Sequence, residues 1–274
     1  MNHGVPDRRP PSADLVRRVS RVVGTVRQGT RPGLRVLLYH AVGTPVPDDT
    51  YGMSVSAQEF AAQMRWLREE SGCTMVPLGG GVESLVATSA QAPSLAVTFD
   101  DGFLDVLNIA APVLTAYRIP FTVFVVGGYL EDPPVRHTYL DPPALRELAA
   151  IPSASIGAHG YTHRPLTRLA PAALDDELRR SRDVLGSHLG TRPVAMSYPH
   201  GAVNRRVVAG ALAAGFAFGG TSVLGVNGRG TSPLRLRRTE IVSADRADDF
   251  AGKVRGDYDW YSIRQRLYWP VPHD

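Results

Sequence analysis

Two adjacent carboxylates follow an apolar run in the segment AVTFDDGFLDV, residues 96–106. Because like charges this close cost free energy, Asp100 and Asp101 each raise the pKa of the other. A cation bound beside the pair would hold one carboxylate and relieve this repulsion. The pair therefore indicates a candidate metal site, with an Asp-Asp-Gly turn that caps a helix as the alternative.

Two histidines stand four residues apart in the segment GAHGYTHRP, residues 157–165. This spacing lets the imidazoles of His159 and His163 face one metal ion, and surface or capping histidines are the alternative. With one carboxylate they form a two-His, one-Asp set that leaves positions open for water and substrate. We predict that Asp101 binds the metal and that Asp100 takes a proton from the water beside it.

Elements that could position these groups alternate along the chain, because β-branched apolar runs predict strands and apolar residues at helical spacing predict helices. Strands are predicted at 34–42, 94–101, 120–127, 154–159, 193–199, 216–223 and 236–243. Helices are predicted at 55–71, 103–118, 141–150, 170–190 and 204–215. Ser56 and Glu59 predict a capping box for the first of these helices. The glycine-rich segment PLGGGVESL, 77–85, lacks the lysine of a P-loop and is predicted to be a flexible turn.

Strands that read as near-continuous apolar runs between helices indicate a parallel sheet covered by helices. About seven such strands are enough to curl into an incomplete α/β barrel. No phosphate-binding glycine fingerprint follows the first strand, which argues against a dinucleotide-binding fold. Reactive groups of such sheets follow the carboxyl ends of the strands. The polar residues found there are His40, Asp100, Asp101, His159, His163 and His200.

Three segments are predicted: a basic N-terminal segment at 1–33, a central domain at 34–250 and an aromatic-rich tail at 251–274. Valines at helical spacing between arginines in the first segment predict a helix that could contact an anionic membrane, or one that packs on the domain. The chain has 30 basic and 26 acidic side chains, and the basic ones form no aromatic-interleaved face. We therefore expect no nucleic-acid partner.

Cys73 is the single cysteine, so the chain needs no oxidising compartment for an internal disulfide. The residues after Met1 contain no apolar signal core. No run of about 18 apolar residues predicts a spanning helix. We expect a cytoplasmic protein that could contact the inner face of the membrane through its N-terminal segment.

The motifs taken together resemble the polysaccharide deacetylase family, which comprises the NodB-homology or carbohydrate esterase family 4 enzymes. The segment that begins TFDDGFLDVLNIAAPVL resembles the first motif region, IGAHGYTHRPL resembles the zinc-binding motif, and MSYPHGAVN resembles the third. The segments LLYHAVG and VSAQEFAAQMRWL are similar to the branch that contains the poly-N-acetylglucosamine deacetylases. The likeness runs from residue 34 to residue 245 with the motifs in the expected order.

This resemblance implies a single domain with a distorted, incomplete (β/α)7 barrel. It implies an enzyme that removes acetyl groups from N-acetylated amino sugars, either N-acetylglucosamine-type oligo- or polysaccharides or glycosylated precursors, and releases acetate. It further implies that Asp101, His159 and His163 bind Zn²⁺ or another divalent metal such as Co²⁺ or Ni²⁺, with Asp100 as general base. The sequence does not indicate an oligomeric state.

The resemblance also implies roles for three residues outside the metal set. The backbone N–H of His200 would stabilise the oxyanion. His40 would protonate the leaving amine, with a buried, hydrogen-bonded histidine as the alternative. Many family members orient the base with an arginine at the position of Ser197, so we expect Arg238, or else its neighbour Arg237, to supply that charge.

Other positions concern the substrate and the departures from the family. Tyr161, Tyr198 and Pro199 are expected to contact the sugar, and Tyr51, Tyr129 and Tyr139 could stack on its rings. Gly160 replaces the Ser/Thr that usually follows the first zinc histidine, which weakens a loop-ordering hydrogen bond. No late histidine in a hydrophobic-x-His motif is present, since only His273 remains near the end. Two other functions stay open: a hydrolase of other linear or cyclic amides, or a catalytically silent sugar-binding module.

Overall fold

The computed structural model describes residues 13–26, 29–46, 49, 51–87 and 92–262. Its main sheet consists of strands β1 (Gly33–Tyr39), β4 (Thr74–Met75), β5 (Pro93–Phe99), β6 (Phe121–Val125), β7 (Ala154–Ala158), β8 (Ala195–Ser197), β9 (Phe218–Gly220) and β10 (Thr239–Glu240). The strand order is β10-β1-β5-β6-β7-β8-β9, with β4 beside β5, and the strand pairs are parallel. A second small sheet joins β2 (Ala41–Val42) to β3 (Ser54–Val55).

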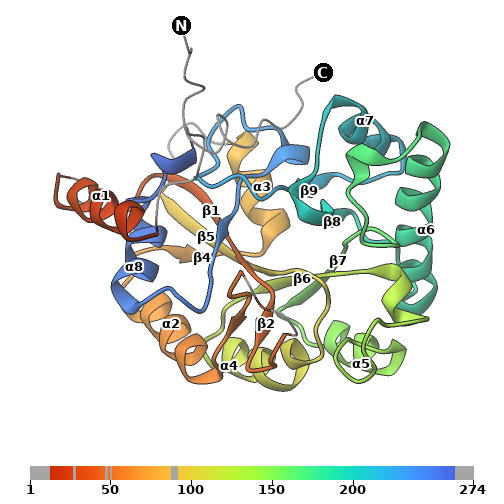
Figure 1. Cartoon of the computed structure of the whole chain (residues 1–274), viewed down its shortest axis with the longest axis horizontal. Coiled ribbons are helices and arrows are strands. Elements are labelled where there is room, and N and C mark those ends of the chain that lie inside the picture. Colours follow the sequence, from red (N-terminus) through yellow and green to blue (C-terminus); the bar gives the residue numbers. More distant parts are fainter. Residues whose placement is uncertain (1–12, 27–28, 47–48, 50, 88–91, 263–274) are drawn as a thin grey trace, which may run out of the picture.

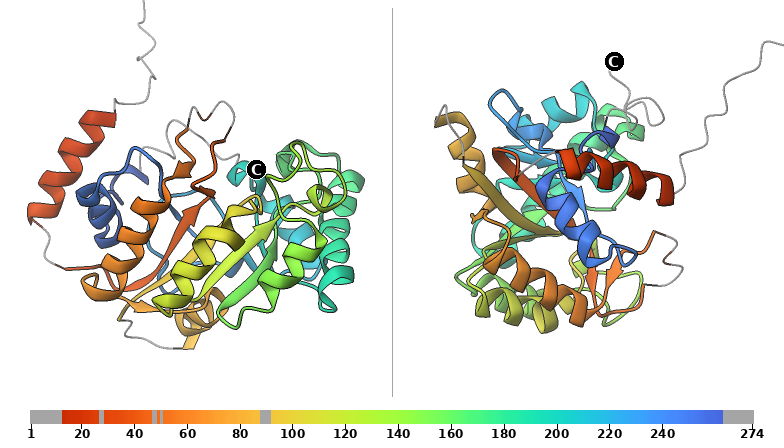
Figure 2. Two further views of the ribbon diagram at one scale, coloured as in Figure 1. Left: turned by 90° about the horizontal axis from the view of Figure 1, so that it is seen from below. Right: turned by 90° about the vertical axis from the view of Figure 1, so that its left-hand side faces the viewer.

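Helices surround the sheet on its outer side (Figure 1; two further views in Figure 2). They are α1 (Ala13–Val26), α2 (Ala57–Glu69), α3 (Leu78–Ala87), α4 (Ala111–Ala116), α5 (Pro142–Ala149), α6 (Pro171–Leu189), α7 (Arg205–Ala213) and α8 (Ala247–Arg255). Among the described strands, no ladder joins β9 to β10, so the curled sheet forms an incomplete barrel. The predicted distorted, incomplete (β/α) barrel is confirmed.

The register of the strands brings the candidate residues to one edge of the sheet. β1 and β5 pair along their whole length and end with Tyr39 opposite Phe99. The next residues, His40 and Asp100, therefore leave the sheet side by side. In the same way β6 and β7 end with Val125 opposite Ala158, and the strand after them ends at Ser197 opposite Gly220.

The core under this edge is built from the inner faces of strands and helices. Helix α2 begins with the predicted capping box of Ser56 and Glu59. Phe60, Met64 and Leu67 of this helix are buried against the sheet. Each such side chain contributes about 1.5–3 kcal/mol through removal from water. This packing fixes the outer wall behind β1 and β5.

Two predicted elements differ in the structure. The segment 77–85 forms most of helix α3 rather than a turn, because Val82 and Leu85 bury and Gly81 lets the helix approach Leu34 of β1. A Cβ at Gly81 would lie 2.8 Å from a methyl carbon of Leu34. The predicted helix 103–118 divides into a π-helical turn at Val106–Ala110 and α4, because Pro112 in the first turn of α4 has no N–H for a continuous ladder.

Helix α1 packs along helix α8, as the right-hand view of Figure 2 shows. Arg17 lies 3.2 Å from Asp249, and the indole N–H of Trp260 donates to Ser20 at 3.0 Å. The domain boundary predicted at residue 250 falls inside α8, and tail residues 263–274 lie outside the described part of the chain. Membrane contact by the N-terminal segment stays a prediction. No helix in the described residues is long and apolar enough to cross a bilayer.

Candidate active site

Asp101, His159 and His163 form a cluster at the carboxyl ends of β5 and β7. Their candidate ligand atoms all lie within 4.8 Å of one another. Oδ1 of Asp101 is 3.2 Å from Nε2 of His159 and 3.1 Å from Nε2 of His163. This oxygen is buried and has no hydrogen-bond partner among the described residues. Two nitrogens and an oxygen that converge without hydrogen-bond geometry fit the donor set of a divalent cation.

The backbone at this cluster adopts an unusual conformation. Asp101 and His163 have φ angles of 70° and 60°, in the left-handed region that few residues other than glycine occupy. Gly102 and Gly160 continue these turns with φ angles of 74° and 71°. Such backbone strain persists only where surrounding contacts hold it, and it concentrates at functional sites. Here it occurs in the two turns that follow β5 and β7 and that carry Asp101 and His163.

His159 is oriented from behind by the strand next to it. Its Nδ1 lies 2.9 Å from the carbonyl oxygen of Ser197, which leaves Nε2 facing Asp101. A hydrogen bond of this kind fixes the tautomer and the ring plane of a metal-binding histidine. Burial alone would lower the pKa of His159, but the charges of Asp100 and Asp101 raise it above its ordinary value. The two carboxylates therefore favour a positive charge at this ring, either on a cation bound to it or on the protonated ring itself.

Asp100 is buried beside this cluster and is held by Arg238. The guanidinium donates from one nitrogen to each carboxylate oxygen, at 2.7 Å in both cases. Ser197 also donates its hydroxyl to Asp100 at 2.8 Å and accepts from Arg238 at 2.8 Å. Although burial raises the pKa of Asp100, the charge of Arg238 lowers it below its usual range. Asp100 is therefore ionised at neutral pH, and the arginine expected from the last strand lies on it.

Arg237, the alternative source of that charge, reaches a different part of the molecule. Its guanidinium contacts the carbonyl oxygen of Leu224 at 3.5 Å, and its backbone pairs with Asn227. The structure thus places Arg238, and not Arg237, on the candidate base.

His40 follows β1 directly and enters the same site. It is half-buried, and its Nδ1 is buried without a hydrogen-bond partner among the described residues. Its charge is one of the influences that lower the pKa of Asp100 and of Asp101, so it lies close to both. The alternative reading, a buried histidine with its hydrogen bonds satisfied, does not describe this side chain.

Asp105 holds the loop that follows His40, a contact that the motif search missed. Its Oδ2 accepts from the backbone N–H groups of Val42 at 2.7 Å and Thr44 at 3.3 Å. Its Oδ1 is buried without a partner among the described residues, and burial raises the pKa of Asp105 to about 6. The only signal in the sequence was a third acid in TFDDGFLD, which also suits an ordinary helix start.

His200 lies at the rim of the site with a left-handed backbone, φ 57°. Its ring centroid is 4.7 Å from that of His163, and Nε2 is 3.2 Å from the carbonyl oxygen of His163. Burial, and then the charge of His163, lower the pKa of His200. Among the loop and turn hydrogen bonds between backbone groups of the described residues, none has the N–H of His200 as its donor.

Two of the expected sugar contacts are corrected by the structure. Tyr198 is fully buried and donates its hydroxyl to the carbonyl oxygen of Leu234 at 2.8 Å. Pro199 is buried as well, where it packs against Gly160. Neither offers a surface to a sugar, because both side chains, which directly follow β8, are buried. Tyr161 is accessible, but the guanidinium of Arg180 covers a face of its ring at 3.8 Å.

A different set of aromatic rings lies beside the metal cluster. Tyr129 and Tyr139 are half-buried, with ring centroids 4.7 Å apart. Tyr139 stacks on Phe103 at 4.8 Å, and Tyr129 lies 6.1 Å from His163. Burial, and then the charge of Asp101, raise the pKa of Tyr139 to about 12. The partly exposed rings form an aromatic wall, here defined as Tyr139, Tyr129 and His163, with the buried Phe103 behind Tyr139.

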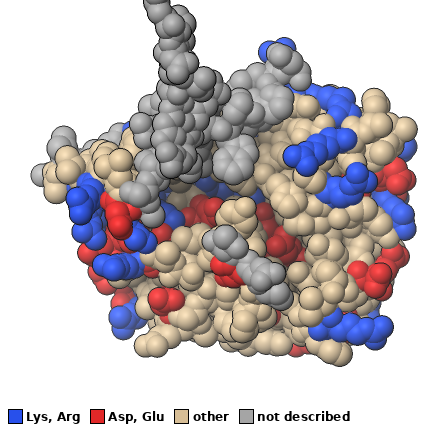
Figure 3. Space-filling view, viewed as in Figure 1, with Lys and Arg blue, Asp and Glu red and all other residues tan. Residues whose placement is uncertain are grey.

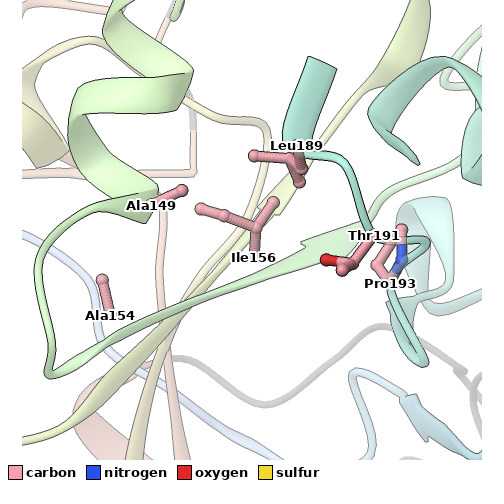
Figure 4. Close-up of a pocket in the computed structure, with 6 residues that line it drawn as sticks. All are labelled: Ala149, Ala154, Ile156, Leu189, Thr191 and Pro193. Atoms are coloured by element: carbon pink, nitrogen blue, oxygen red, sulfur yellow. The ribbon is translucent and has the colours of Figure 1, made fainter. Parts of the chain in front are cut away.

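Acidic and basic side chains are distributed unevenly over the face of the molecule drawn in Figure 3. Figure 3 shows acidic atoms in a hollow near the middle, with basic side chains towards the edges. The pocket in Figure 4 is separate, because it lies at the beginning of β7 rather than at its carboxyl end. It is lined by Ala149, Ala154, Ile156, Leu189, Thr191 and Pro193, none of which ionises.

Comparisons with known proteins show which family this chain resembles. A family model described as polysaccharide deacetylase matches residues 87–219. YxkH of Bacillus subtilis (strain 168), a polysaccharide deacetylase-type protein, is 28% identical over 211 residues, which are 76% of this chain and 71% of YxkH. The chitooligosaccharide deacetylase of Bradyrhizobium sp. (strain ANU 289) is 33% identical over 130 residues, 45% of this chain and 53% of that enzyme.

A solved structure matches the fold over most of the chain. IcaB from Ammonifex degensii superposes with a TM-score of 0.71 at 26% identity, over 85% of this chain and 100% of that one. The family match includes the Asp-Asp pair, both histidines of the cluster and the turn at His200. This chain therefore carries a polysaccharide deacetylase domain of the NodB-homology, carbohydrate esterase family 4 type, which is a family of hydrolases.

Proposed function

We propose that this protein is a metal-dependent N-deacetylase that converts N-acetylated amino sugars to free amino sugars and acetate. The proposal rests on one observation, the contact between a metal-type cluster and an ionised carboxylate. A two-His, one-Asp cluster lies against a second carboxylate, Asp100, which an arginine holds ionised. The name of the chitooligosaccharide deacetylase relative supports a sugar substrate for the same domain.

A divalent cation such as Zn²⁺ fits Asp101, His159 and His163, because their donor atoms converge and Oδ1 of Asp101 has no other partner in the described part of the chain. When bound there, such an ion lowers the pKa of water and withdraws electron density from an amide carbonyl. The carbonyl of Ser197 keeps the ring of His159 in the tautomer that such a site requires.

Asp100 acts as the general base. Of the described residues, only Arg238 donates to its Oδ1, so this oxygen keeps capacity to accept a proton. As the proton moves to Asp100, the water oxygen forms its bond to the acetamide carbon. The carbon–nitrogen bond then breaks with its electron pair on nitrogen, and His40 protonates the departing amine. The backbone N–H of His200 donates to the oxyanion during this sequence.

The aromatic wall gives the sugar a surface next to the reacting amide. Tyr129 stands between Tyr139 and His163, which would place a stacked pyranose ring beside the cluster. The wall is short, so one or two rings would contact it. An oligomer or a glycosylated precursor thus fits as well as a long polysaccharide does.

Mass spectrometry of N-acetylglucosamine compounds, from the monosaccharide to longer oligomers, tests the proposal. We expect replacement of acetyl groups by hydrogen and release of acetate, with loss of both in chelator and recovery on addition of Zn²⁺. The Asp101→Ala variant should be inactive under each condition. Turnover that survives the chelator and this substitution would contradict metal-dependent deacetylation, and cleavage of non-sugar amides alone would favour the broader amide hydrolase.

A further inference from the structure

We propose that Glu177 is a positioning residue that fixes the loop between the two histidine ligands in its metal-binding shape. The role rests on the proposed function, because it concerns affinity for the ion that this function requires. Glu177 belongs to helix α6 and was not recognised from the sequence, where it stands among the charged residues of LDDELRR.

Both oxygens of the Glu177 carboxylate accept hydrogen bonds from this loop. Its Oε1 accepts from the backbone N–H groups of Tyr161 at 2.8 Å and Thr162 at 2.7 Å. Its Oε2 accepts from the hydroxyl of Thr162 at 3.0 Å. Tyr161 and Thr162 lie directly between the ligands His159 and His163. Both carboxylate oxygens are therefore committed to the segment whose shape sets the distance between the two imidazoles.

The side chain of Glu177 is well placed to resist movement of the loop. Only 5% of its surface is exposed, and its helix is anchored by the buried side chains of Leu174 and Leu178. In the described residues no arginine, lysine or histidine forms an ion pair with it. Its charge is therefore balanced by the three loop donors, and hydrogen bonds to a charged acceptor are the strong kind.

Gly160 shows that the loop is built around this carboxylate. A Cβ at Gly160 would lie 3.0 Å from Oε1 of Glu177 and 3.1 Å from Cγ of Pro199. The position also has a left-handed backbone, with φ of 71°. A serine or threonine after the first histidine, as expected for the family, would be strained here, because its Cβ would make both close contacts on a left-handed backbone. Glu177 and Thr162 supply the loop-ordering hydrogen bonds that such a residue would have made.

Without the carboxylate, the backbone N–H groups of Tyr161 and Thr162 and the hydroxyl of Thr162 would hydrogen-bond to water instead. The loop would then no longer be held in one shape. The loop would then have to become ordered when the ion binds, and the entropy cost of this ordering would lower the metal affinity. Groups that orient ligands in this way typically change metal affinity by about 10- to 100-fold when they are removed. Glu177→Gln keeps an acceptor for the two amides, so a smaller loss is expected than for Glu177→Ala.

The test is a titration of the metal-free full-length protein with Zn²⁺ in competition with a chromophoric chelator. Glu177→Ala should weaken binding about 10- to 100-fold, Glu177→Gln less, and Thr162→Val, which removes one of the three hydrogen bonds, less again. The control is Asp176→Asn, the exposed acid next to Glu177 on the same helix. Absorption of the Co²⁺-loaded proteins reports the ligand geometry and should change in Glu177→Ala but not in Asp176→Asn.

The outcomes separate this inference from the function on which it rests. Equal affinities and equal Co²⁺ spectra for wild type and both Glu177 variants would overturn the positioning role. If Glu177→Ala fails to fold, Glu177→Gln and Thr162→Val decide the question, provided their metal-free melting temperatures match wild type. A wild-type protein that binds Zn²⁺ with this variant series but deacetylates no sugar would contradict the proposed function and leave the role of Glu177 standing.

Discussion

Arg238 and Asp100 lie 138 residues apart in the chain and form a bidentate ion pair with both distances at 2.7 Å. The pair links the residue directly before β10 to the residue directly after β5. Arg238 also donates from Nε to the carbonyl oxygen of Thr221 at 2.8 Å, which fixes the plane of its guanidinium. The carboxylate of the candidate base therefore has a fixed orientation as well as a fixed charge.

Replacement of Arg238 by lysine should lower kcat by at least about tenfold, because an ammonium group cannot donate to both carboxylate oxygens in this planar arrangement. Asp100→Asn should lower kcat further, by about 10²- to 10⁴-fold, since it removes the base itself. Steady-state kinetics on an N-acetylglucosamine oligomer measures both, with zinc content determined in parallel. Arg237→Lys is the matched control, and a loss as large as that of Arg238→Lys would contradict the assignment.

The ion pair also shows how far the sequence could predict this site. Metal ligands and base occur in local patterns, DDG and HxxxH, whose spacing carries chemical meaning. Ser197 stands where many family members have an arginine, so the charge had to come from another residue, and two neighbouring arginines of the predicted last strand, Arg238 and Arg237, were the candidates. Asp105 and Glu177 could not be found in this way, because they act on backbone N–H groups, which have no sequence signature.

The sequence also did not show which side chains face the core. Tyr198 was expected to be accessible because it lies near the end of a predicted strand, but β8 is only three residues long and its register decides which side chains face the core. Helix α3 was missed because glycines suggest a turn, whereas here one of them lets a helix pack closely on β1. Both outcomes depend on contacts between distant segments, which local patterns do not contain.

Zinc should raise the melting temperature of the wild-type protein and leave that of Asp101→Ala almost unchanged. A ligand that binds only the folded state at a hundred times its Kd stabilises it by about 2.7 kcal/mol. Thermal melts of the metal-free proteins with and without Zn²⁺ measure the shift. Asp132→Ala, at an exposed acid, is the control and should respond as wild type does. Equal shifts in all three proteins would place the ion elsewhere.

Gly160→Ser should weaken metal binding, although it introduces the residue type expected from the family at this position. The new Cβ would meet Glu177 and Pro199 at 3.0 and 3.1 Å, on a backbone with φ of 71°. We expect a lower Zn²⁺ affinity together with a lower kcat, because Pro199 precedes the His200 amide. Gly190→Ser serves for comparison, since it shares a φ of 74° but has no neighbour within 4 Å. Stronger metal binding in Gly160→Ser would show that the loop is not built around Glu177.

Tyr129→Leu should raise KM for oligomeric substrates by about two- to tenfold, because an aromatic contact is worth about 0.5–1.5 kcal/mol beyond its buried area. Tyr129→Phe keeps the ring and should change KM little. Tyr51→Leu is the control, as this ring is 76% exposed and belongs to no ring pair among the described residues. An unchanged KM in Tyr129→Leu, with kcat also unchanged, would remove the aromatic wall from the substrate site.

The stability of the protein should depend on pH through Asp105, which lies beneath the His40 loop. Burial raises the pKa of this carboxyl from 3.8 to about 6, so the folded state favours its neutral form. A raised pKa contributes stability that is fully present below 3.8 and is lost as the pH rises through about 6. The shift corresponds to about 3 kcal/mol between these limits.

Asp105→Asn removes the charge but keeps an oxygen that accepts from Val42 or Thr44. The free energy of unfolding of wild type, measured relative to this variant by urea denaturation, should therefore fall by up to about 3 kcal/mol between about pH 4 and pH 8. Asp132→Asn, at an exposed position, should show no such pH-dependent difference from wild type. A difference between wild type and Asp105→Asn that stays constant over this range would mean that Asp105 titrates normally. The unpartnered Oδ1 would then have to be solvated, and the loop that carries His40 would be held less firmly than these contacts indicate.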